Sequence, residues 1–177
     1  MAHAAVTNIF NALRSRKKTI PPLPDGIWQH PLYFLAFGLG TGTLPFAPGT
    51  FGTLMAIPLY LLVQSLSLPF YLLFVFVFIV FSCWISERIS HDIQIHDHPG
   101  MNIDEFAGFF VTMIDAPQGF GWILLGFLLF RLFDIWKPWP IRFIDIKIHN
   151  GIGIVLDDIV GGIYACLLIQ IIARIVQ

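Results

Sequence analysis

Residues 130–162 read FRLFDIWKPWPIRFIDIKIHNGIGIVLDDIVGG, and this stretch decides the fold because it sets charges between two strongly apolar segments. Its charged residues include Arg131, Asp134, Lys137, Asp157 and Asp158. A charge beside hydrocarbon is costly, so a cluster of acids and bases there marks a functional site by default. Carboxylates bind hard cations, whereas Arg and Lys bind phosphate. The stretch therefore predicts a site for both a cation and a phosphate at the edge of a membrane.

Composition supports a membrane protein of one domain. The chain has 177 residues, of which 56% are hydrophobic and only 12% charged, and its mean hydropathy is +0.77. A soluble domain carries about a quarter charged residues. The formal net charge of −1 and the lack of a nucleic-acid-binding motif exclude nucleic acid as a partner. We expect residues 1–30 to form a cytoplasmic N-terminal segment and residues 31–177 a single membrane-embedded catalytic domain.

The first half of that domain contains a predicted helical hairpin. No Asp, Glu, Lys or Arg occurs between Gly26 and Ser86. Residues 32–39 are too few to cross a bilayer and are predicted to form an interfacial helix. Residues 38–50 are rich in Gly and Pro and are predicted to form a loop. Residues 50–66 and 69–85 are then predicted to form the two arms of the hairpin, after which residues 87–104 return as a polar loop.

Residues 104–134 are predicted to form a second hairpin with its turn at Pro117. Pro and Gly near the middle of the apolar run favour a turn over one long helix. With that turn, nine of the ten Lys and Arg residues fall on the N-terminal side of the membrane, and only Arg174 lies opposite. A single crossing would split them six to four. Because positive residues favour the cytoplasmic side, the hairpin is preferred.

The rest of the chain completes an all-α polytopic bundle. Pro138 predicts that the second arm ends near Trp136. Residues 143–149 are predicted to form an amphipathic interfacial helix. Residues 159–176 are predicted to form the last membrane span. The result is about four to five membrane-embedded helices, some of them short, with the polar motifs converging on the cytoplasmic face. Association into a homo-oligomer stays open.

The charged motifs each have a structural and a functional interpretation. Arg131 and Asp134 share a helical face, so they form either an intrahelical ion pair or part of a phosphate site. Asp157 and Asp158 point about 100° apart on a helix, so both bind one cation only if the backbone unwinds, which Gly151 and Gly153 would permit. Alternatively, Asp157 caps the last helix.

Two further acids, Asp104 and Glu105, stand at the start of an apolar helix, where capping is again the alternative. If the second hairpin is right, they meet the other acids on one face. So many carboxylates need a cation, and Mg²⁺ is usual where phosphate is also bound. The loop before Thr50 offers backbone N–H groups to an anion. The histidines at 91, 96 and 98 are interpreted as surface residues, with Asp97 kept as a candidate near the site.

Together these motifs resemble the phosphatidylglycerophosphatase A family of bacterial membrane phosphatases. The similarity runs from about residue 31 to 165 and lies in four stretches: PGTFGTL (48–54); HDH (96–98) with DEFAG (104–108); FRLFDIWKPWPI (130–141); and GIGI (151–154) followed by the Asp pair. The chain differs in Asn150, where the family usually has Gly, and in Gly161, where Ala is expected.

The resemblance implies Mg²⁺-dependent hydrolysis of phosphatidylglycerophosphate to phosphatidylglycerol and phosphate at the cytoplasmic face of the bacterial inner membrane. In this interpretation carboxylates, Asp134 among them, hold Mg²⁺, and Arg131 and Lys137 neutralise the phosphate charge. Arg131, Asp134 and Lys137 are the expected catalytic residues, and backbone near the glycines binds substrate. The expected metal ligands are Asp104, Glu105, Asp157 and Asp158, and the expected substrate-binding residues are Gly49, Thr50, Gly151 and Gly153. Whether water or a carboxylate is the nucleophile stays open.

Two other functions are compatible with clustered acids. A phosphoalcohol transferase should carry several Asp at helical spacing in one long motif, whereas here the acids are spread over three motifs. A divalent-cation transporter or channel should hold its acids near the bilayer midplane, whereas these acids are predicted at helix ends beside Pro and Gly.

Overall fold

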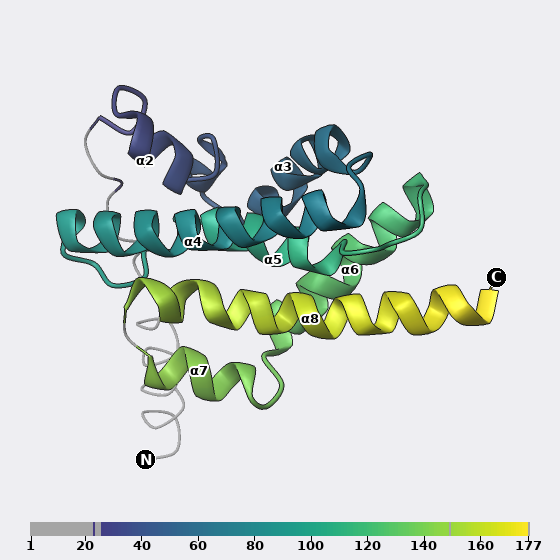
Figure 1. Cartoon of the computed structure of the whole chain (residues 1–177). Helices are drawn as coiled ribbons and strands as arrows, with labels where there is room; N and C mark the ends of the chain where they lie inside the picture. Colours follow the sequence, from purple (N-terminus) through teal and green to yellow (C-terminus); the bar gives the residue numbers. More distant parts are fainter. Residues whose placement is uncertain (1–22, 24–25, 149, 177) are drawn as a thin grey trace, which may run out of the picture.

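All regular structure in the described residues is helical, as the sequence predicts (Figure 1). The computed structural model describes residue 23, residues 26–148 and residues 150–176. In chain order the helices are α2 (Pro31–Ala36), the 3-10 helix η1 (Thr41–Thr43), α3 (Pro48–Val63), α4 (Leu68–Ile93), α5 (Ile103–Thr112), α6 (Phe120–Trp136), α7 (Ile141–Lys147) and α8 (Gly151–Val176). Most of the predicted segment 1–30 lies outside the described residues, although Ile27 is buried against the domain.

The first predicted hairpin is confirmed as α3 and α4. Both helices begin with a proline in their first turn, Pro48 in α3 and Pro69 in α4. That position has no helical hydrogen bond to lose, so proline suits it. The prediction that residues 87–104 form a loop is wrong for its first part, because α4 continues to Ile93. The polar residues of that last stretch, including the pair Arg88–Asp92 at 3.2 Å, continue the helix as a solvated face.

The second hairpin is confirmed as α5 and α6. The turn between them includes Asp115 at φ 52° and Gly119 at φ 126°, conformations that continue neither helix. From α8, Gln170 Nε2 donates to the carbonyl oxygens of Ile114 at 3.0 Å and Asp115 at 2.9 Å. These bonds fasten the turn to the bundle. At the other end α6 stops at Trp136, directly before Lys137 and Pro138, as predicted.

The last helix starts earlier than the sequence suggests. The prediction placed its start at Ile159, but α8 begins at Gly151. Asn150 Oδ1 accepts the N–H of Gly153 at 2.9 Å, and the Glu87 carboxylate of α4 accepts the N–H of Gly151. These two acceptors satisfy the first N–H groups of the helix. The interpretation of Asp157 as its cap is therefore wrong.

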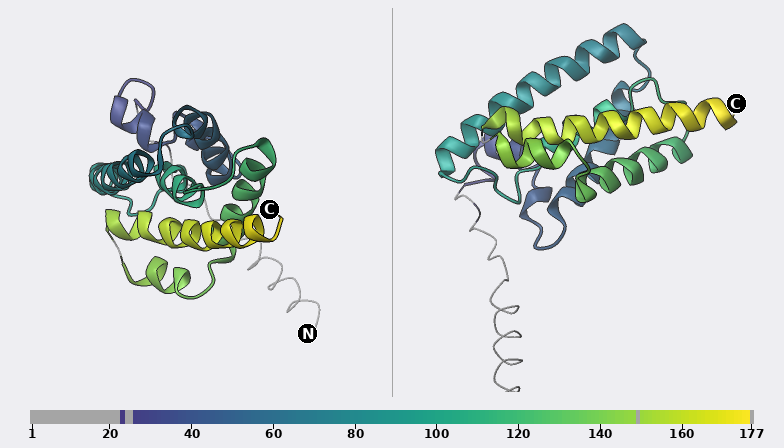
Figure 2. Two further views of the ribbon diagram at one scale, coloured as in Figure 1. Left: turned by 45° about the vertical axis from the view of Figure 1, so that its right-hand side comes forward. Right: turned by 90° about the horizontal axis from the view of Figure 1, so that it is seen from below.

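Within the described residues, two helices are long and apolar enough to cross a membrane, α4 and α8, with 26 residues each. At about 1.5 Å per residue each is about 39 Å long, more than the hydrocarbon core needs. The shorter apolar helix α3 has 16 residues. α4 and α8 pack against each other and run in opposite directions, with α7 on the outer side of α8 (Figures 1 and 2).

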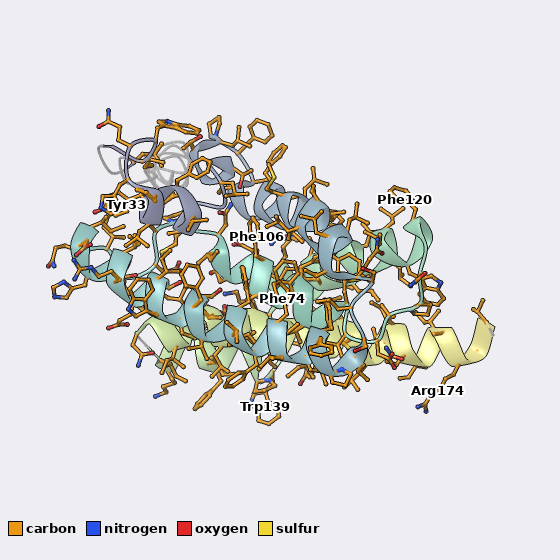
Figure 3. All side chains as sticks on the ribbon, turned by 45° about the horizontal axis from the view of Figure 1, so that its top comes forward. Tyr33, Phe74, Phe106, Phe120, Trp139 and Arg174 are labelled. Carbon is orange, nitrogen blue, oxygen red and sulfur yellow. The ribbon has the colours of Figure 1, made fainter. Side chains whose placement is uncertain are left out.

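Helix α5 is the centre of the bundle, in contact with α3, α4, α6 and α8. Its phenylalanines Phe106, Phe109 and Phe110 are buried, and Figure 3 shows Phe106 near the middle of the molecule. The rings of Phe110 and Phe78 meet edge to face at 4.9 Å between centroids. A short helix enclosed on all sides carries its first turn, with two acids, into the interior.

Glycines bring α5 and α8 into backbone contact. A Cβ at Gly162 would overlap the carbonyl oxygen of Gly108, and a Cβ at Gly108 would lie 2.8 Å from the carbonyl oxygen of Asp158. Small residues at a helix crossing allow this close approach. It sets the acids of α5 beside those of α8.

Candidate active site

A cavity of about 270 Å³ opens among the ends of four helices. We call it the acid cavity. Its lining comes from the loop before α5, from the first turn of α5, from the last turn of α6, and from α7 and α8. Eight of its lining residues are charged: Asp97, Asp104, Glu105, Asp134, Lys137, Asp145, Asp157 and Asp158. Acids that the sequence spreads over three motifs thus share one space.

Three carboxylates in the cavity have the geometry of a cation site. One oxygen each of Asp104, Glu105 and Asp158 lie within 4.8 Å of one another. Asp104 is 9% and Asp158 3% exposed, and Glu105 Oε2 is buried without a hydrogen-bond partner among the described residues. Buried carboxylates in mutual contact repel one another, and a hard cation relieves that repulsion. Burial and the neighbouring Asp158 carboxylate raise the pKa of Glu105 to about 8, and burial raises that of Asp104 as well.

Arg131 stands beside this group. Its Nη1 lies 2.9 Å from Asp134 Oδ2, 3.4 Å from Thr53 Oγ1 and 3.9 Å from Glu105 Oε1. The intrahelical ion pair is therefore present, and its acid, Asp134, lines the cavity. Arg131 Nε is buried and has no hydrogen-bond partner among the described residues. Arg131 itself is not among the residues that line the cavity, and it meets the cavity through Asp134 and Glu105.

Lys137 bridges two carboxylates on the other side of the cavity. Its Nζ lies 2.6 Å from Asp157 Oδ2 and 3.0 Å from Asp145 Oδ1. Burial by itself would lower the pKa of Lys137, but Asp157 and Asp145 together raise it well above its usual value. Lys137 also adopts the left-handed conformation, φ 45°, that ends α6. Its charge is therefore already matched within the protein.

The adjacent acids of α8 divide between these two groups. Asp158 joins Asp104 and Glu105, whereas Asp157 pairs with Lys137. Successive residues of a helix point about 100° apart, so neighbouring side chains face different partners. The helix is regular here, so the unwinding that Gly151 and Gly153 would permit does not occur, and both glycines lie in its first turn.

The predicted substrate-binding residues lie at different distances from the cavity. Gly153 lines it, and Gly151 packs against α4, where a Cβ would lie 2.5 Å from the carbonyl oxygen of Cys83. Gly49 lies behind Glu105, since a Cβ there would overlap Glu105 Oε1. Thr50, in the first turn of α3, is half-buried and is not among the residues that line the cavity.

The histidine loop differs from the prediction. His96 and Asp97 line the cavity, so Asp97 lies where the sequence kept it as a candidate. His98, interpreted as a surface residue, is fully buried. Its Nδ1 accepts the N–H of Gly100 at 3.0 Å, and its ring packs on Phe37 at 5.2 Å between centroids. His98 is therefore a structural residue that holds the loop before α5.

Sequence reasoning missed three polar residues around the site. Thr53 contacts Arg131, and Asp145 contacts Lys137. The third, Asn102, is buried, and its Nδ2 donates to Thr41 Oγ1 at 3.1 Å and to the Pro48 carbonyl oxygen at 3.0 Å. Of the three, only Thr53 could have been found from sequence spacing, because it follows Gly49 by one helical turn. Its hydroxyl donates to the Gly49 carbonyl oxygen at 3.0 Å.

Comparison with known proteins gives a consistent picture. The sequence profile of the family described as Phosphatidylglycerophosphatase A matches residues 34–173. The curated Phosphatidylglycerophosphatase A of Escherichia coli K12 is 40% identical over 136 residues, which cover 76% of this chain and 79% of that protein. The protein of the same name from Haemophilus influenzae is 38% identical over 150 residues, 84% of this chain and 92% of that one.

A more distant relative carries a different name. A Bacteroides thetaiotaomicron protein, provisionally named a phosphatidylinositol-3-phosphatase, is 31% identical over 142 residues, 76% of this chain and 88% of its own length. No solved structure matches the chain.

Proposed function

Because the chain belongs to the phosphatidylglycerophosphatase A family, we propose that it hydrolyses phosphatidylglycerophosphate to phosphatidylglycerol and inorganic phosphate. Water adds across the ester bond of the terminal phosphate, whose phosphorus–oxygen bond to the glycerol breaks. The observation that carries the proposal is the acid cavity itself, where three clustered carboxylates stand beside the ion pair of Arg131 and Asp134.

The donor set fits a hard divalent cation, and we propose Mg²⁺. Asp104, Glu105 and Asp158 supply oxygen atoms only, as Mg²⁺ prefers, and the unpartnered Glu105 Oε2 leaves one of them unsatisfied without an ion. Bound Mg²⁺ would polarise the phosphoryl oxygens and lower the pKa of an attacking water. The sequence-based prediction named Asp157 as a fourth ligand, but its ion pair with Lys137 favours a supporting role.

The remaining charged residues have distinct tasks in this proposal. Arg131 is held by Asp134 and Thr53 with its Nη1 3.9 Å from Glu105 Oε1, and from there it supplies positive charge beside the carboxylates for the phosphate. The planar fork of an arginine suits a phosphoryl group. Lys137 lines the cavity and is fixed between Asp157 and Asp145, so the remaining N–H of its ammonium group can donate to the phosphate without a large loss of side-chain freedom on binding.

The proposed membrane location and orientation also follow from membership of this family. We propose a multi-pass protein of the bacterial inner membrane, with α4 and α8 crossing the bilayer and the acid cavity facing the cytoplasm. Among the described residues, five basic side chains lie towards the cavity end of α4, α6 and α8 and only Arg174 lies at the opposite end of α8, a distribution that supports this orientation. The comparisons offer no support for the alternative of a divalent-cation transporter.

The test is phosphate release by the purified protein in detergent from phosphatidylglycerophosphate, with phosphatidylinositol 3-phosphate as the rival substrate. We expect release from the first substrate with Mg²⁺, none with EDTA, and none from the Asp134→Asn variant. Release that survives EDTA would keep the substrate and reject the cation. Preference for the inositol lipid would reject the substrate, and no release from either, with folded protein, would reject the function.

A further inference from the structure

A second hollow adjoins the acid cavity at the corner between α6 and α7. It measures about 560 Å³, and we call it the aromatic groove. Its lining includes Trp136, Trp139, Arg142, Phe143 and Ile146. Lys137 lines both this groove and the acid cavity. The two spaces therefore meet at one side chain, with carboxylates on one side of it and hydrocarbon on the other.

The groove is apolar, and its side chains are open to the surroundings. Trp139 is 81% and Trp136 68% exposed, and Figure 3 shows Trp139 directed away from the molecule. Helix α7 buries only Ile141 against the bundle, so Phe143 and Ile146 face outward. Tryptophans gather where membrane hydrocarbon meets water. A surface of this kind at the end of a helix bundle fits the glycerol and acyl region of a lipid.

The groove also contains a positive charge without a partner. Lys137 is matched by Asp157 and Asp145, but Arg142 forms no ion pair with any described residue. An exposed arginine beside tryptophans is complementary to an anion at the membrane surface, and a phosphodiester has that charge and geometry.

Resting on the proposed function, we propose that the aromatic groove binds the lipid end of the substrate. The glycerol and first part of the acyl chains lie against Trp139 and Phe143, and the bridging phosphodiester lies on Arg142. The terminal phosphate then passes Lys137 into the acid cavity. The groove thus selects phosphate monoesters carried on an anionic diacyl lipid, and Arg142 and Trp139 act on binding, not on the reacting bond.

Kinetics in mixed detergent micelles test this division. We expect Arg142→Gln to raise the KM for phosphatidylglycerophosphate about fivefold, the scale of one exposed ionic contact. Trp139→Ala should raise it about tenfold, as loss of an aromatic anchor does. In both variants kcat at saturating substrate should stay within about twofold of wild type. The controls are Lys147→Gln, an exposed cation of α7 outside the groove lining, and Phe120→Ala, an exposed aromatic at the far end of α6.

A second readout does not require catalysis. Bilayers containing phosphatidylglycerol with brominated acyl chains should quench the fluorescence of Trp139, taken as the difference between wild type and Trp139→Phe. Brominated phosphatidylcholine at the same mole fraction should quench it about half as strongly, and Arg142→Gln should remove that difference while Lys147→Gln keeps it.

The outcomes separate this inference from the proposed function. Two results would overturn the inference and leave the proposed phosphatase activity unaffected. One is release by the wild type with an unchanged KM in both groove variants, and the other is equal quenching by the two lipids. A change of oligomeric state in Trp139→Ala, with KM unaffected, would assign the groove to a second copy of the chain. Absence of wild-type release would reject the function, and the quenching data would then decide alone whether the groove binds anionic lipid.

Discussion

The acid cavity and the aromatic groove share Lys137 but are built in opposite ways. The cavity is lined by carboxylates from separate helices, several of them buried, and it lies beside the close crossing of α5 and α8. The groove is made by residues close together in the chain, from the end of α6 to α7, most of them exposed. Burial strengthens electrostatic interactions and suits bond breaking, whereas an exposed aromatic surface suits partition from a membrane. In the proposed enzyme, chemistry and recognition are therefore separable by mutation.

The largest effect should come from the cavity. Asp158→Asn removes one of three clustered carboxylates, and we expect kcat to fall by about 10³-fold, because the loss of several kcal/mol of charge stabilisation is a large factor in rate. KM should change little. The same variant should be more stable than wild type in the absence of Mg²⁺, because carboxylate repulsion is relieved.

The matched control is Asp92→Asn, which removes an exposed acid paired with Arg88 on α4. Its kcat should stay within about twofold of wild type. A steady-state assay that leaves Asp158→Asn above a tenth of the wild-type rate would remove Asp158 from the proposed cation site.

The next largest effect should come from Lys137. Because this residue lines both the acid cavity and the aromatic groove, its loss should affect chemistry and lipid recognition together. Lys137→Gln leaves Asp157 buried without its cation, and we expect a loss of about 2 kcal/mol in the free energy of unfolding. Activity should fall about 10²-fold with both kcat and KM affected, unlike the groove variants.

Thermal unfolding in detergent checks the stability change. The double variant Lys137→Gln/Asp157→Asn should recover most of the stability without recovering activity, because the buried charge of Asp157 is removed and Asp145, which loses its partner, is exposed. Full recovery of activity in the double variant would mean that Lys137 acts only by neutralising Asp157.

A smaller effect is expected behind the cavity. In Gly49→Ala the new methyl group would overlap Glu105 Oε1 and lie 3.2 Å from Arg131 Nη1, so both side chains must shift. We expect an activity loss of about tenfold, since a small misplacement of catalytic groups is costly. The matched control is Gly161→Ala, whose methyl group would meet no atom closer than 3.8 Å. It should keep wild-type activity, and equal losses in the two variants would contradict this account.

The smallest effect concerns pH. Burial and the Asp158 carboxylate raise the pKa of Glu105 to about 8, so a proton competes with the proposed cation at neutral pH. Roughly a tenth of Glu105 is ionised at pH 7 and half at pH 8, so the half-saturating Mg²⁺ concentration should fall about fivefold across that interval. It should continue to fall from pH 8 to 9, because burial raises the pKa of Asp104 as well. Titration of activity with Mg²⁺ at the three pH values measures this, and a constant midpoint would place Glu105 outside the cation site.

Local signals in the sequence predicted most of the helices. Pro117 and the nearby glycine predicted the turn between α5 and α6, and Pro138 predicted the end of α6 at Trp136. These features act within a few residues, so one sequence is enough to interpret them. The motifs also predicted that acids and bases gather at one place, because two hairpins return the chain to the same side.

The errors have two causes. The sequence interpretation ended α4 where its residues become polar, although a polar stretch with the pair Arg88–Asp92 continues the helix as a solvated face. It delayed α8 because Glu87, which satisfies the start of α8, comes from another helix. The burial of His98 was likewise missed, since its contact with Phe37 joins residues far apart in the chain. Long-range contacts of this kind leave no periodic pattern.

The sequence alone determined the all-helical membrane character of this chain, the two hairpins and the set of charged residues that converge. Only the tertiary structure decided which acid meets which partner. A helix turns neighbouring side chains about 100° apart, and the glycine crossing of α5 and α8 sets the rotation between them. That rotation puts Asp158 with Asp104 and Glu105 and leaves Asp157 to Lys137, because packing, not spacing, sets how two helices face each other.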